Sequence, residues 1–314
     1  MQRIRFLILL LGILGGVILA NNNALAQTGV ALTISPLRFE LTTNPGDVLT
    51  NKIRIFNSSK STLSVRMETE DFRPIGELGE VIVAPEEEKV YSLKRWVTIE
   101  PKEFTLEPNE QKFVDFTISI PQEAEPGGKY GSILASVTGS IGEGSGSAIA
   151  QKVGSLVLLT VAGNVKEDML VKEFSAPNFS EYGPIKFTMR FENKGSVHIR
   201  PKGFITIADW RGKKVEDLEF PQSNVIPGAT RKIEAIWQKK VLIGRYTATL
   251  IGSYGTTNTP IDPVIITFWV FPWKVGLAVF GGILLVLIIL FLTRKRLRLA
   301  MKILLKGEKS LPRD

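Results

Sequence analysis

Two apolar runs without a charged residue, one near each end of the 314-residue chain, constrain its fold more than any other feature. The first run covers residues 6–20 and the second covers residues 275–293, which makes them 15 and 19 residues long. At ~1.5 Å per helical residue the first run reaches only about 22 Å, whereas the second reaches about 28 Å and matches a ~30 Å hydrocarbon core. We therefore expect one transmembrane helix, at residues 275–293.

The sequence around the first run is typical of a secretory signal peptide. Arg3 and Arg5 precede the run, and Ala24 and Ala26 follow it at the spacing that signal peptidase recognises. Residues 1–26 are therefore predicted to be a signal peptide.

The sequence around the second run predicts its orientation in the membrane. The basic tail at 294–314 follows it directly, and such clusters are retained in the cytoplasm. Trp269, Phe271 and Trp273 precede it, where aromatic rings favour the headgroup level. The predicted localisation is the cell membrane, as a single-pass type I protein with its large domain extracytoplasmic and its C-terminus cytoplasmic.

The net charge of +8 does not indicate a nucleic-acid partner once it is divided along the chain. Two cations precede the first run, Lys274 directly precedes the second, and the tail at 294–314 has a net charge of +6. Residues 27–273 therefore have a net charge of −1. A nearly neutral domain lacks the basic surface that phosphate backbones require. We expect no nucleic-acid partner.

The chain contains no cysteine and a single histidine, His198. The absence of cysteine excludes disulfides, thiol enzymes and lipoprotein anchors. His198 follows a predicted turn with no serine or aspartate motif beside it, so we interpret it as a solvated or capping residue. No cofactor and no metal site are predicted.

The exported part consists of short alternating runs rich in Val, Ile, Thr and Phe, separated by turn residues. Residues 52–56, 113–120 and 186–191 alternate in this way, and each run ends in Asn, Pro or Gly. Many short strands with frequent turns favour an all-β fold of two tandem immunoglobulin-like β-sandwiches before the C-terminal helix. We place the first sandwich at 30–167 and the second at 168–271.

A weak internal repeat supports two sandwiches. A Pro-Asn or Pro-Gly turn precedes an alternating strand in each half, and a Gly-basic-Tyr sequence that ends in Tyr130 or Tyr246 begins a later strand. A tyrosine at this place suits a tyrosine corner, in which the hydroxyl binds nearby backbone. Chance similarity of the two halves is the alternative.

No residue pattern predicts an enzyme. The candidates for the paired carboxylates of a glycosidase are Glu68, Glu70 and Asp71, and the run of glutamates at 86–88. Carboxylates on strand faces and in turns of this kind are usually solvated. The Gly/Ser-rich stretch at 139–147 opens no helix and is predicted to be a hairpin loop, not a phosphate cradle. The exposed aromatic residues are too scattered in sequence to predict a sugar platform. We expect no enzymatic activity and no small-molecule substrate.

Several segments resemble known families. Residues 30–39 (VALTISPLRF), 53–59 (IRIFNSS) and 99–111 (IEPKEFTLEPNEQ) look like parts of the first domain of bacterial periplasmic pilus chaperones, which are PapD-like. The whole arrangement, together with 126–131 (PGGKYG) and 209–213 (DWRGK), is more similar to the WxL-interacting proteins of bacterial cell surfaces. The resemblance implies an anchored adaptor that contacts peptidoglycan or a surface protein.

The resulting hypothesis is a membrane-anchored, non-enzymatic, extracytoplasmic adaptor of a bacterium that binds a cell-surface protein or a cell-wall component, with the membrane reached through the single C-terminal helix. Two alternatives are a membrane-tethered assembly chaperone that captures an extended client strand and a carbohydrate-binding accessory module. In the resembling chaperones an arginine of the first strand holds a partner carboxylate, and Arg38 has the matching position. Arg38 is thus the predicted partner-binding residue, with a merely solvated edge residue as the alternative.

Overall fold

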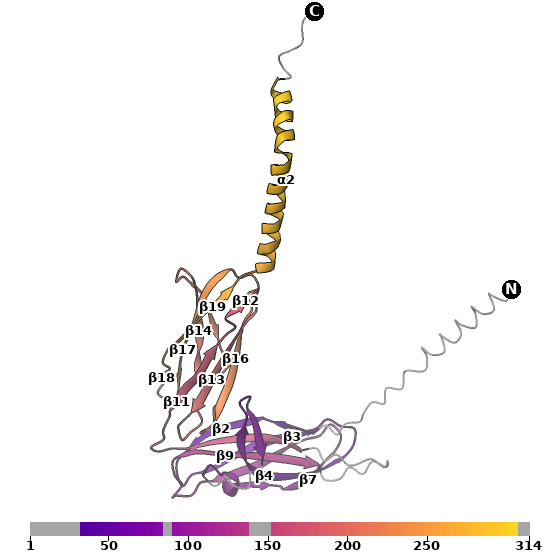
Figure 1. Cartoon of the computed structure of the whole chain (residues 1–314). Coiled ribbons are helices and arrows are strands. Elements are labelled where there is room, and N and C mark those ends of the chain that lie inside the picture. The colour runs from indigo at the N-terminus through magenta and orange to yellow at the C-terminus, as the bar shows by residue number, and fades with distance from the viewer. Residues whose placement is uncertain (1–31, 84–89, 138–151, 307–314) are drawn as a thin grey trace, which may run out of the picture. The chain divides into compact units, whose positions relative to one another are not determined.

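The computed structural model describes residues 32–83, 90–137 and 152–306, with side chains as far as Arg294. The chain divides into two compact units, one made of Met1–Arg73 with Val81–Asn164 and the other of Pro74–Glu80 with Val165–Asp314. Strands make up most of both units (Figure 1), and each unit has its own hydrophobic core between two sheets. The prediction of two immunoglobulin-like β-sandwiches followed by an apolar helix is confirmed.

The first sandwich consists of a four-stranded and a six-stranded sheet. The smaller sheet has the order β1 (Leu32–Ser35), β3 (Val48–Asn57), β8 (Gln111–Ser119) and β6 (Val97–Glu100). The larger has the order β2 (Arg38–Thr43), β10 (Lys152–Val161), β9 (Gly127–Val137), β4 (Leu63–Ile75) and β5 (Glu80–Val83), with β7 (Glu103–Leu106) also on β4. Strand β2 pairs with β10 in parallel. The alternation seen in the sequence is that of the core, because Ile53, Ile55, Phe116 and Ile118 are all fully buried.

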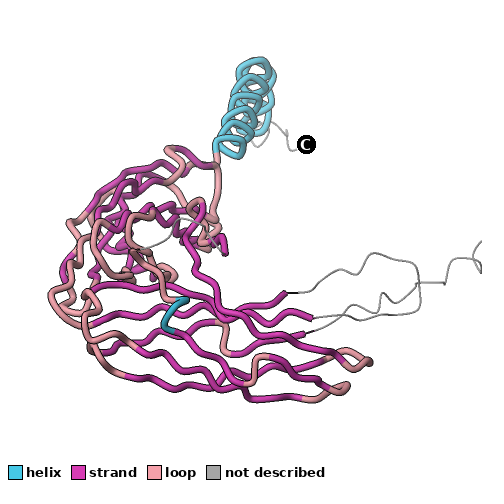
Figure 2. The backbone as a smooth tube through the Cα atoms, turned by 90° about the horizontal axis from the view of Figure 1, so that it is seen from below, coloured by secondary structure: helices cyan, strands magenta, loops and turns pink. Residues whose placement is uncertain are grey.

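The second sandwich consists of a three-stranded and a six-stranded sheet. As in the first sandwich, strands joined by loops and turns make up its backbone (Figure 2). The smaller sheet has the order β11 (Met169–Ser175), β13 (Ile185–Asn193) and β16 (Thr230–Trp237). The larger has the order β12 (Phe179–Ser180), β19 (Val264–Val270), β17 (Gly244–Tyr254), β14 (Lys202–Asp209) and β15 (Lys214–Glu219), with β18 (Thr259–Pro260) also on β17. Trp237 is fully buried between the sheets, 5.5 Å from the ring of Tyr246 and 6.5 Å from that of Phe268.

The two sandwiches share a buried asparagine at the end of the second strand of their smaller sheets. The Asn57 amide donates to the carbonyls of Ser61 (2.8 Å) and Leu106 (3.1 Å), and that of Asn193 donates to the carbonyls of Val197 (2.8 Å) and Val225 (2.7 Å). Each side chain therefore joins its own turn to a distant loop of the same sandwich.

The backbone around the two asparagines also matches. The N–H of Asn109 donates to the Asn57 carbonyl and that of Gly228 to the Asn193 carbonyl, both at 2.9 Å. Asn109 and Gly228 both have positive φ, 61° and 74°. Since glycine adopts this conformation without strain and asparagine tolerates it, the Pro-Asn and Pro-Gly turns of the sequence repeat are equivalent. The repeat in the sequence is therefore a repeat of structure.

The tyrosines of the repeat begin later strands in both halves, as predicted. Tyr130 lies near the start of β9 and Tyr246 near the start of β17. The Tyr246 hydroxyl lies 3.4 Å from both the N–H and the carbonyl of Ile243, three residues upstream. This contact is that of a tyrosine corner.

Helix α2 (Trp273–Lys306) follows β19 after two residues. Its segment Trp273–Arg294 is long and apolar enough to cross a membrane, with a mean hydropathy of 3.1. None of the most apolar part of this segment is buried against the rest of the protein, in contrast to a core helix.

Candidate functional site

Arg38 is the first residue of β2, which is an edge strand of the six-stranded sheet of the first sandwich. Alternation places Phe39 and Leu41 against the core and Arg38 on the outer face of the sheet. In the described residues, no strand pairs with the side of β2 opposite to β10. Arg38 thus lies on an open sheet edge.

The backbone of this edge is orientated for pairing with another strand. The carbonyls of Leu37 and Thr43 accept hydrogen bonds from β10 and the residue after it, at 3.0 and 2.7 Å. In a parallel ladder such bonds use alternate residues, so the N–H and C=O groups of Arg38 and Thr42 point away from β10. These groups form the hydrogen-bonding side of the edge.

The Arg38 side chain is partly exposed and makes an ion pair within its own strand. Its Nε lies 2.7 Å from Oε1 of Glu40, and 48% of the Arg38 side chain is accessible to solvent. Such an exposed pair contributes at most about 1 kcal/mol, because water and salt screen it. A partner carboxylate can therefore displace Glu40 at little cost.

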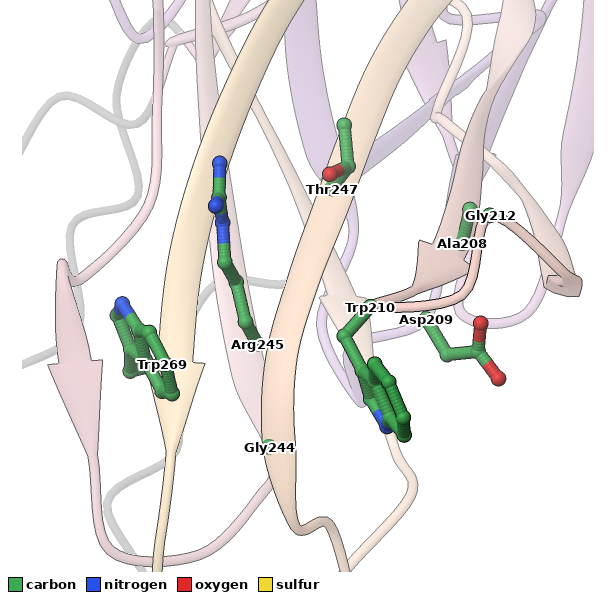
Figure 3. Close-up of a pocket in the computed structure, with 8 residues that line it drawn as sticks. All are labelled: Ala208, Asp209, Trp210, Gly212, Gly244, Arg245, Thr247 and Trp269. Carbon is green, nitrogen blue, oxygen red and sulfur yellow. The ribbon is translucent and has the colours of Figure 1, made fainter.

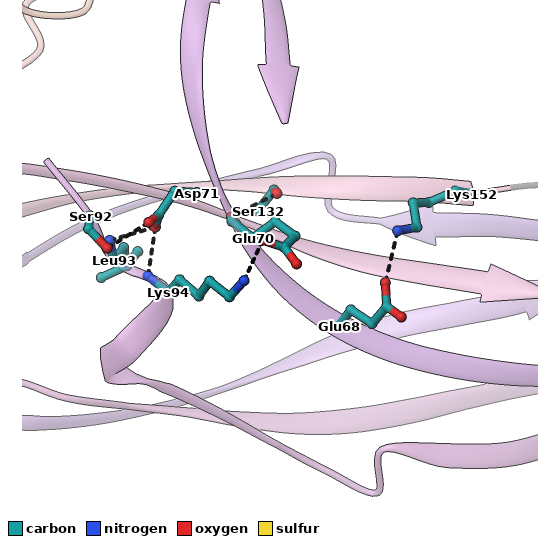
Figure 4. A network of polar contacts seen from close by, with 8 residues as sticks. All are labelled: Glu68, Glu70, Asp71, Ser92, Leu93, Lys94, Ser132 and Lys152. Atoms are coloured by element: carbon teal, nitrogen blue, oxygen red, sulfur yellow. Dashed lines mark hydrogen bonds and ion pairs between the residues drawn. The ribbon is translucent and has the colours of Figure 1, made fainter. Parts of the chain in front are cut away.

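The acidic residues Glu68, Glu70 and Asp71 all make polar contacts within the first sandwich (Figure 4). Oε2 of Glu68 lies 2.8 Å from Nζ of Lys152, and Oε2 of Glu70 lies 2.6 Å from Nζ of Lys94. Asp71 accepts hydrogen bonds from the N–H groups of Leu93 and Lys94, at 2.9 and 2.8 Å, and from the Ser92 hydroxyl. Glu70 and Asp71 therefore attach the chain before β6 to β4, whereas Glu68 connects β4 to β10. The glutamates at 86–88 and the loop at 139–147 lie outside the described residues.

His198 is partly buried after β13, and the described part of the chain contains no group of three or more His, Asp or Glu that could hold a metal ion. Asn57 occurs in a glycosylation acceptor sequence, but the folded chain buries it completely. Its side chain is engaged in the hydrogen bonds described above, so it is inaccessible to a transferase in the folded state.

The structure brings together aromatic residues that are distant in sequence. Trp210 lies in the turn after β14 and Trp269 in β19, and both line one open groove of about 850 Å³ with Arg245 of β17 (Figure 3). The strand order β19-β17-β14 places Arg245 between the two indoles. The aromatic residues are thus less scattered than the sequence suggested, and strand pairing is the reason.

Both tryptophans of the groove are exposed, and a cation lies over one of them. The Arg211 guanidinium is 4.5 Å from the centre of the Trp210 ring. Asp209, at the rim, accepts hydrogen bonds from the N–H groups of Arg211 and Lys213, at 2.9 and 3.0 Å, and so fixes the turn that carries Trp210. A groove with two indoles and a guanidinium can bind a phosphate-bearing or a sugar-like group.

The chain resembles several solved structures at low identity. The class 5 fimbriae chaperone CfaA is 10% identical, with a TM-score of 0.40, over 76% of this chain and 99% of that one. The Salmonella enterica structure of the SafA pilin with the SafB chaperone matches at 11% identity and a TM-score of 0.37, over 77% of this chain and 98% of that one. A Porphyromonas gingivalis protein of unknown function matches at 14% identity and a TM-score of 0.31, over 76% and 99%.

No protein-family model matches the chain, and no curated protein matches its sequence. Membership of the WxL-interacting proteins therefore remains a hypothesis based on the sequence motifs.

Proposed function

We propose that the protein is a membrane-anchored, non-enzymatic, extracytoplasmic adaptor whose first sandwich binds an extended segment of another envelope protein along β2. The single observation that carries this proposal is that β2 is an open edge strand with an exposed arginine at its first position. An added strand satisfies the outward N–H and C=O groups of such an edge and requires little reordering of the receptor.

Arg38 supplies the specificity of this proposed interaction. A guanidinium makes two charge-assisted hydrogen bonds to one carboxylate, which fixes both the position and the direction of the bound segment. The favoured partner is therefore an extended segment that presents a carboxylate, either a side chain or a chain end, next to the start of β2.

The anchor is the segment Trp273–Arg294, which satisfies the length and hydropathy of a membrane span. The basic residues that follow it support a cytoplasmic C-terminus, and with that orientation both sandwiches would lie outside the cytoplasm. An adaptor of this kind would hold its partner close to the outer surface of the membrane.

Strand addition at β2 is tested in two steps, first by crosslinking and then by substitution of an outward-facing residue. In the first step a photo-crosslinking amino acid replaces Thr33 or Thr42 of the full chain in intact cells and identifies the proteins beside each position. We expect a specific partner from position 42 only. The affinity of the full chain in detergent for that partner is then compared between Thr42→Pro and Thr42→Ala.

Proline removes the outward N–H of residue 42, whereas alanine keeps it. Thr42→Pro should abolish binding and Thr42→Ala should retain it, with the unfolding temperature of both variants measured as a control for folding. Equal affinity of the two folded variants would overturn strand addition at β2.

The role of Arg38 is tested against an exposed arginine on the other sheet of the same sandwich, Arg54. A hydrogen bond to a charged group contributes about 1.5 to 3 kcal/mol, so Arg38→Ala should weaken binding roughly 10- to 150-fold. Arg54→Ala should leave the affinity unchanged. If Arg38→Ala binds the partner as tightly as the unchanged chain, Arg38 is not part of the binding site.

A further inference from the structure

Three loops of the second sandwich meet at the end from which α2 starts. They are residues 181–184 before β13, residues 210–213 after β14 and residues 238–243 before β17. The N–H of Gly183 donates to the Lys240 carbonyl (3.1 Å), Asp209 pairs with Tyr246 across β14 and β17, and the N–H of Phe271 donates to the Ser180 carbonyl (3.0 Å). We call these loops, together with the Trp210–Arg245–Trp269 groove, the helix-proximal face.

This face exposes large apolar side chains that a soluble surface would bury. Val241 is 75% exposed, Trp210 64% and Ile243 60%. Leu242, between Val241 and Ile243, is only 2% exposed and packs into the core of the sandwich. The buried leucine anchors the loop while its two neighbours project outward, so their exposure is a fixed property of the fold.

The same face carries an excess of exposed cations. They are Arg211, Lys213, Lys239, Lys240 and Arg245. The acids nearby are already engaged, because Asp209 accepts the backbone N–H groups of its own turn and Oε2 of Glu181 lies 2.8 Å from Nζ of Lys274. Exposed apolar and aromatic side chains mixed with lysine and arginine are the composition of surfaces that bind anionic bilayers.

Chain connectivity places this face at a bilayer if α2 crosses one. Strand β19 ends at Val270 and α2 begins at Trp273, and three residues of extended chain reach about 10 Å. The end of β19, and with it the groove beside Trp269, therefore cannot lie far from the headgroups. This conclusion rests on the membrane span of the proposed function and does not depend on the strand edge of the first sandwich.

We propose that the helix-proximal face is a membrane-docking surface, which inserts Val241, Ile243 and Trp210 among the headgroups of an anionic bilayer and places Arg245 of the groove on a lipid phosphate. Indole rings favour the interface between headgroups and acyl chains, and the guanidinium supplies charge-assisted bonds to phosphate oxygens. Docking would fix the second sandwich against the membrane instead of leaving it to move on the two-residue link to α2.

The absence of native cysteine allows each position to be probed with one label. The full chain is reconstituted in nanodiscs that contain phosphatidylglycerol, with a fluorophore on Val241→Cys, Val286→Cys or Thr257→Cys. Thr257 is exposed in the turn at the opposite end of β17 from Gly244, about 33 Å away along the strand, and is the control. Quenching by a nitroxide on the lipid headgroup, or on the middle of the acyl chain, reports depth.

We expect strong headgroup quenching at position 241, strong acyl-chain quenching at position 286 and little of either at position 257. If position 286 is quenched but position 241 is no more quenched than position 257, docking is refuted while the span is retained. If position 286 is not quenched, the span itself is wrong and docking falls with it. Neither outcome bears on strand capture at β2, which is tested separately.

The groove is tested by charge, with the label kept at position 241. Arg245→Gln should lower the docking equilibrium constant about fivefold, the change that corresponds to about 1 kcal/mol for one cation near an anionic surface. Lys202→Gln, at the other end of the same sheet, is the matched control and should have no effect. An unchanged docking equilibrium constant for Arg245→Gln would show that the groove does not bind lipid phosphate. Displacement of the lipid contact by a soluble peptidoglycan fragment would also contradict lipid phosphate as the ligand of the groove.

Discussion

The buried asparagine of the second sandwich gives the sharpest prediction about stability. Asn193→Ala removes the amide that donates to the carbonyls of Val197 and Val225 and the oxygen that accepts the N–H of Gly195 at 2.8 Å. The Val225 carbonyl keeps a second donor, the N–H of Ile199 at 3.1 Å. The substitution therefore leaves chiefly two groups without partners, the Val197 carbonyl and the Gly195 N–H.

Each buried polar group without a partner costs about 1 to 3 kcal/mol, so we expect Asn193→Ala to lower the free energy of unfolding by about 3 kcal/mol. In a sandwich of roughly 100 residues this corresponds to a fall of about 12 to 24 °C in the unfolding temperature. Differential scanning calorimetry of the full chain in detergent measures the change.

Asn178→Ala is the control, because Asn178 is an exposed asparagine of the same sandwich. Its effect should stay within about 0.5 kcal/mol. Asn57→Ala, at the equivalent place in the first sandwich, should show a loss similar to that of Asn193→Ala. If Asn193→Ala unfolds at the temperature of Asn178→Ala, the asparagine does not hold the turn and the reasoning is wrong.

Three further predictions concern the core, the pH dependence of stability and the topology. Ser155→Ala should raise the free energy of unfolding by about 1 kcal/mol, since its fully buried hydroxyl has no hydrogen-bond partner among the described residues. Ser132→Ala should lower it, because the Ser132 hydroxyl donates to the Glu70 carbonyl, and denaturant titration distinguishes the two signs. The hydrogen bonds from Lys186 and then Lys232 lower the pKa of Glu234 below its usual 4.5, so its contribution to stability is present above that pH and is lost as the pH falls through the lowered value. Glu234→Gln should therefore flatten the acid limb of the stability curve, and an unchanged limb would contradict the assignment. In intact spheroplasts a membrane-impermeant maleimide should label Thr257→Cys and should label Ser310→Cys only after lysis; the reverse pattern would invert the proposed topology.

Much of the fold could be predicted from the sequence because its strands keep a clean period of two. The runs at 52–56 and 186–191 lie within β3 and β13, and their alternate residues are buried in the cores. The uncharged run at 275–293 lies within α2, as expected for an apolar run of this length.

The site was harder to predict because its residues meet only through strand pairing. Trp210 follows β14 and Trp269 lies in β19, and the local sequence does not show that these two strands belong to one sheet, so the sequence did not predict the groove. In the sequence, an asparagine follows each alternating run: Asn57, two residues before Ser59, and Asn193, two residues before Gly195. The structural equivalence of the two asparagines becomes clear only from the matching hydrogen bonds around them. The ion pair between Arg38 and Glu40 is a near-neighbour contact that strand alternation would have allowed.

The most direct test of the central proposal, an open edge at β2 that captures a strand, is amide hydrogen exchange of the full chain in detergent, resolved to single residues by NMR. In the free protein the amides of Arg38 and Thr42, which point away from β10, should exchange quickly, and those of Phe39 and Leu41, which face β10, should exchange slowly. Addition of the partner identified by crosslinking should protect Arg38 and Thr42 and leave Phe39 and Leu41 unchanged. Protection of Arg38 and Thr42 already in the free protein, or no change on binding, would contradict the proposal.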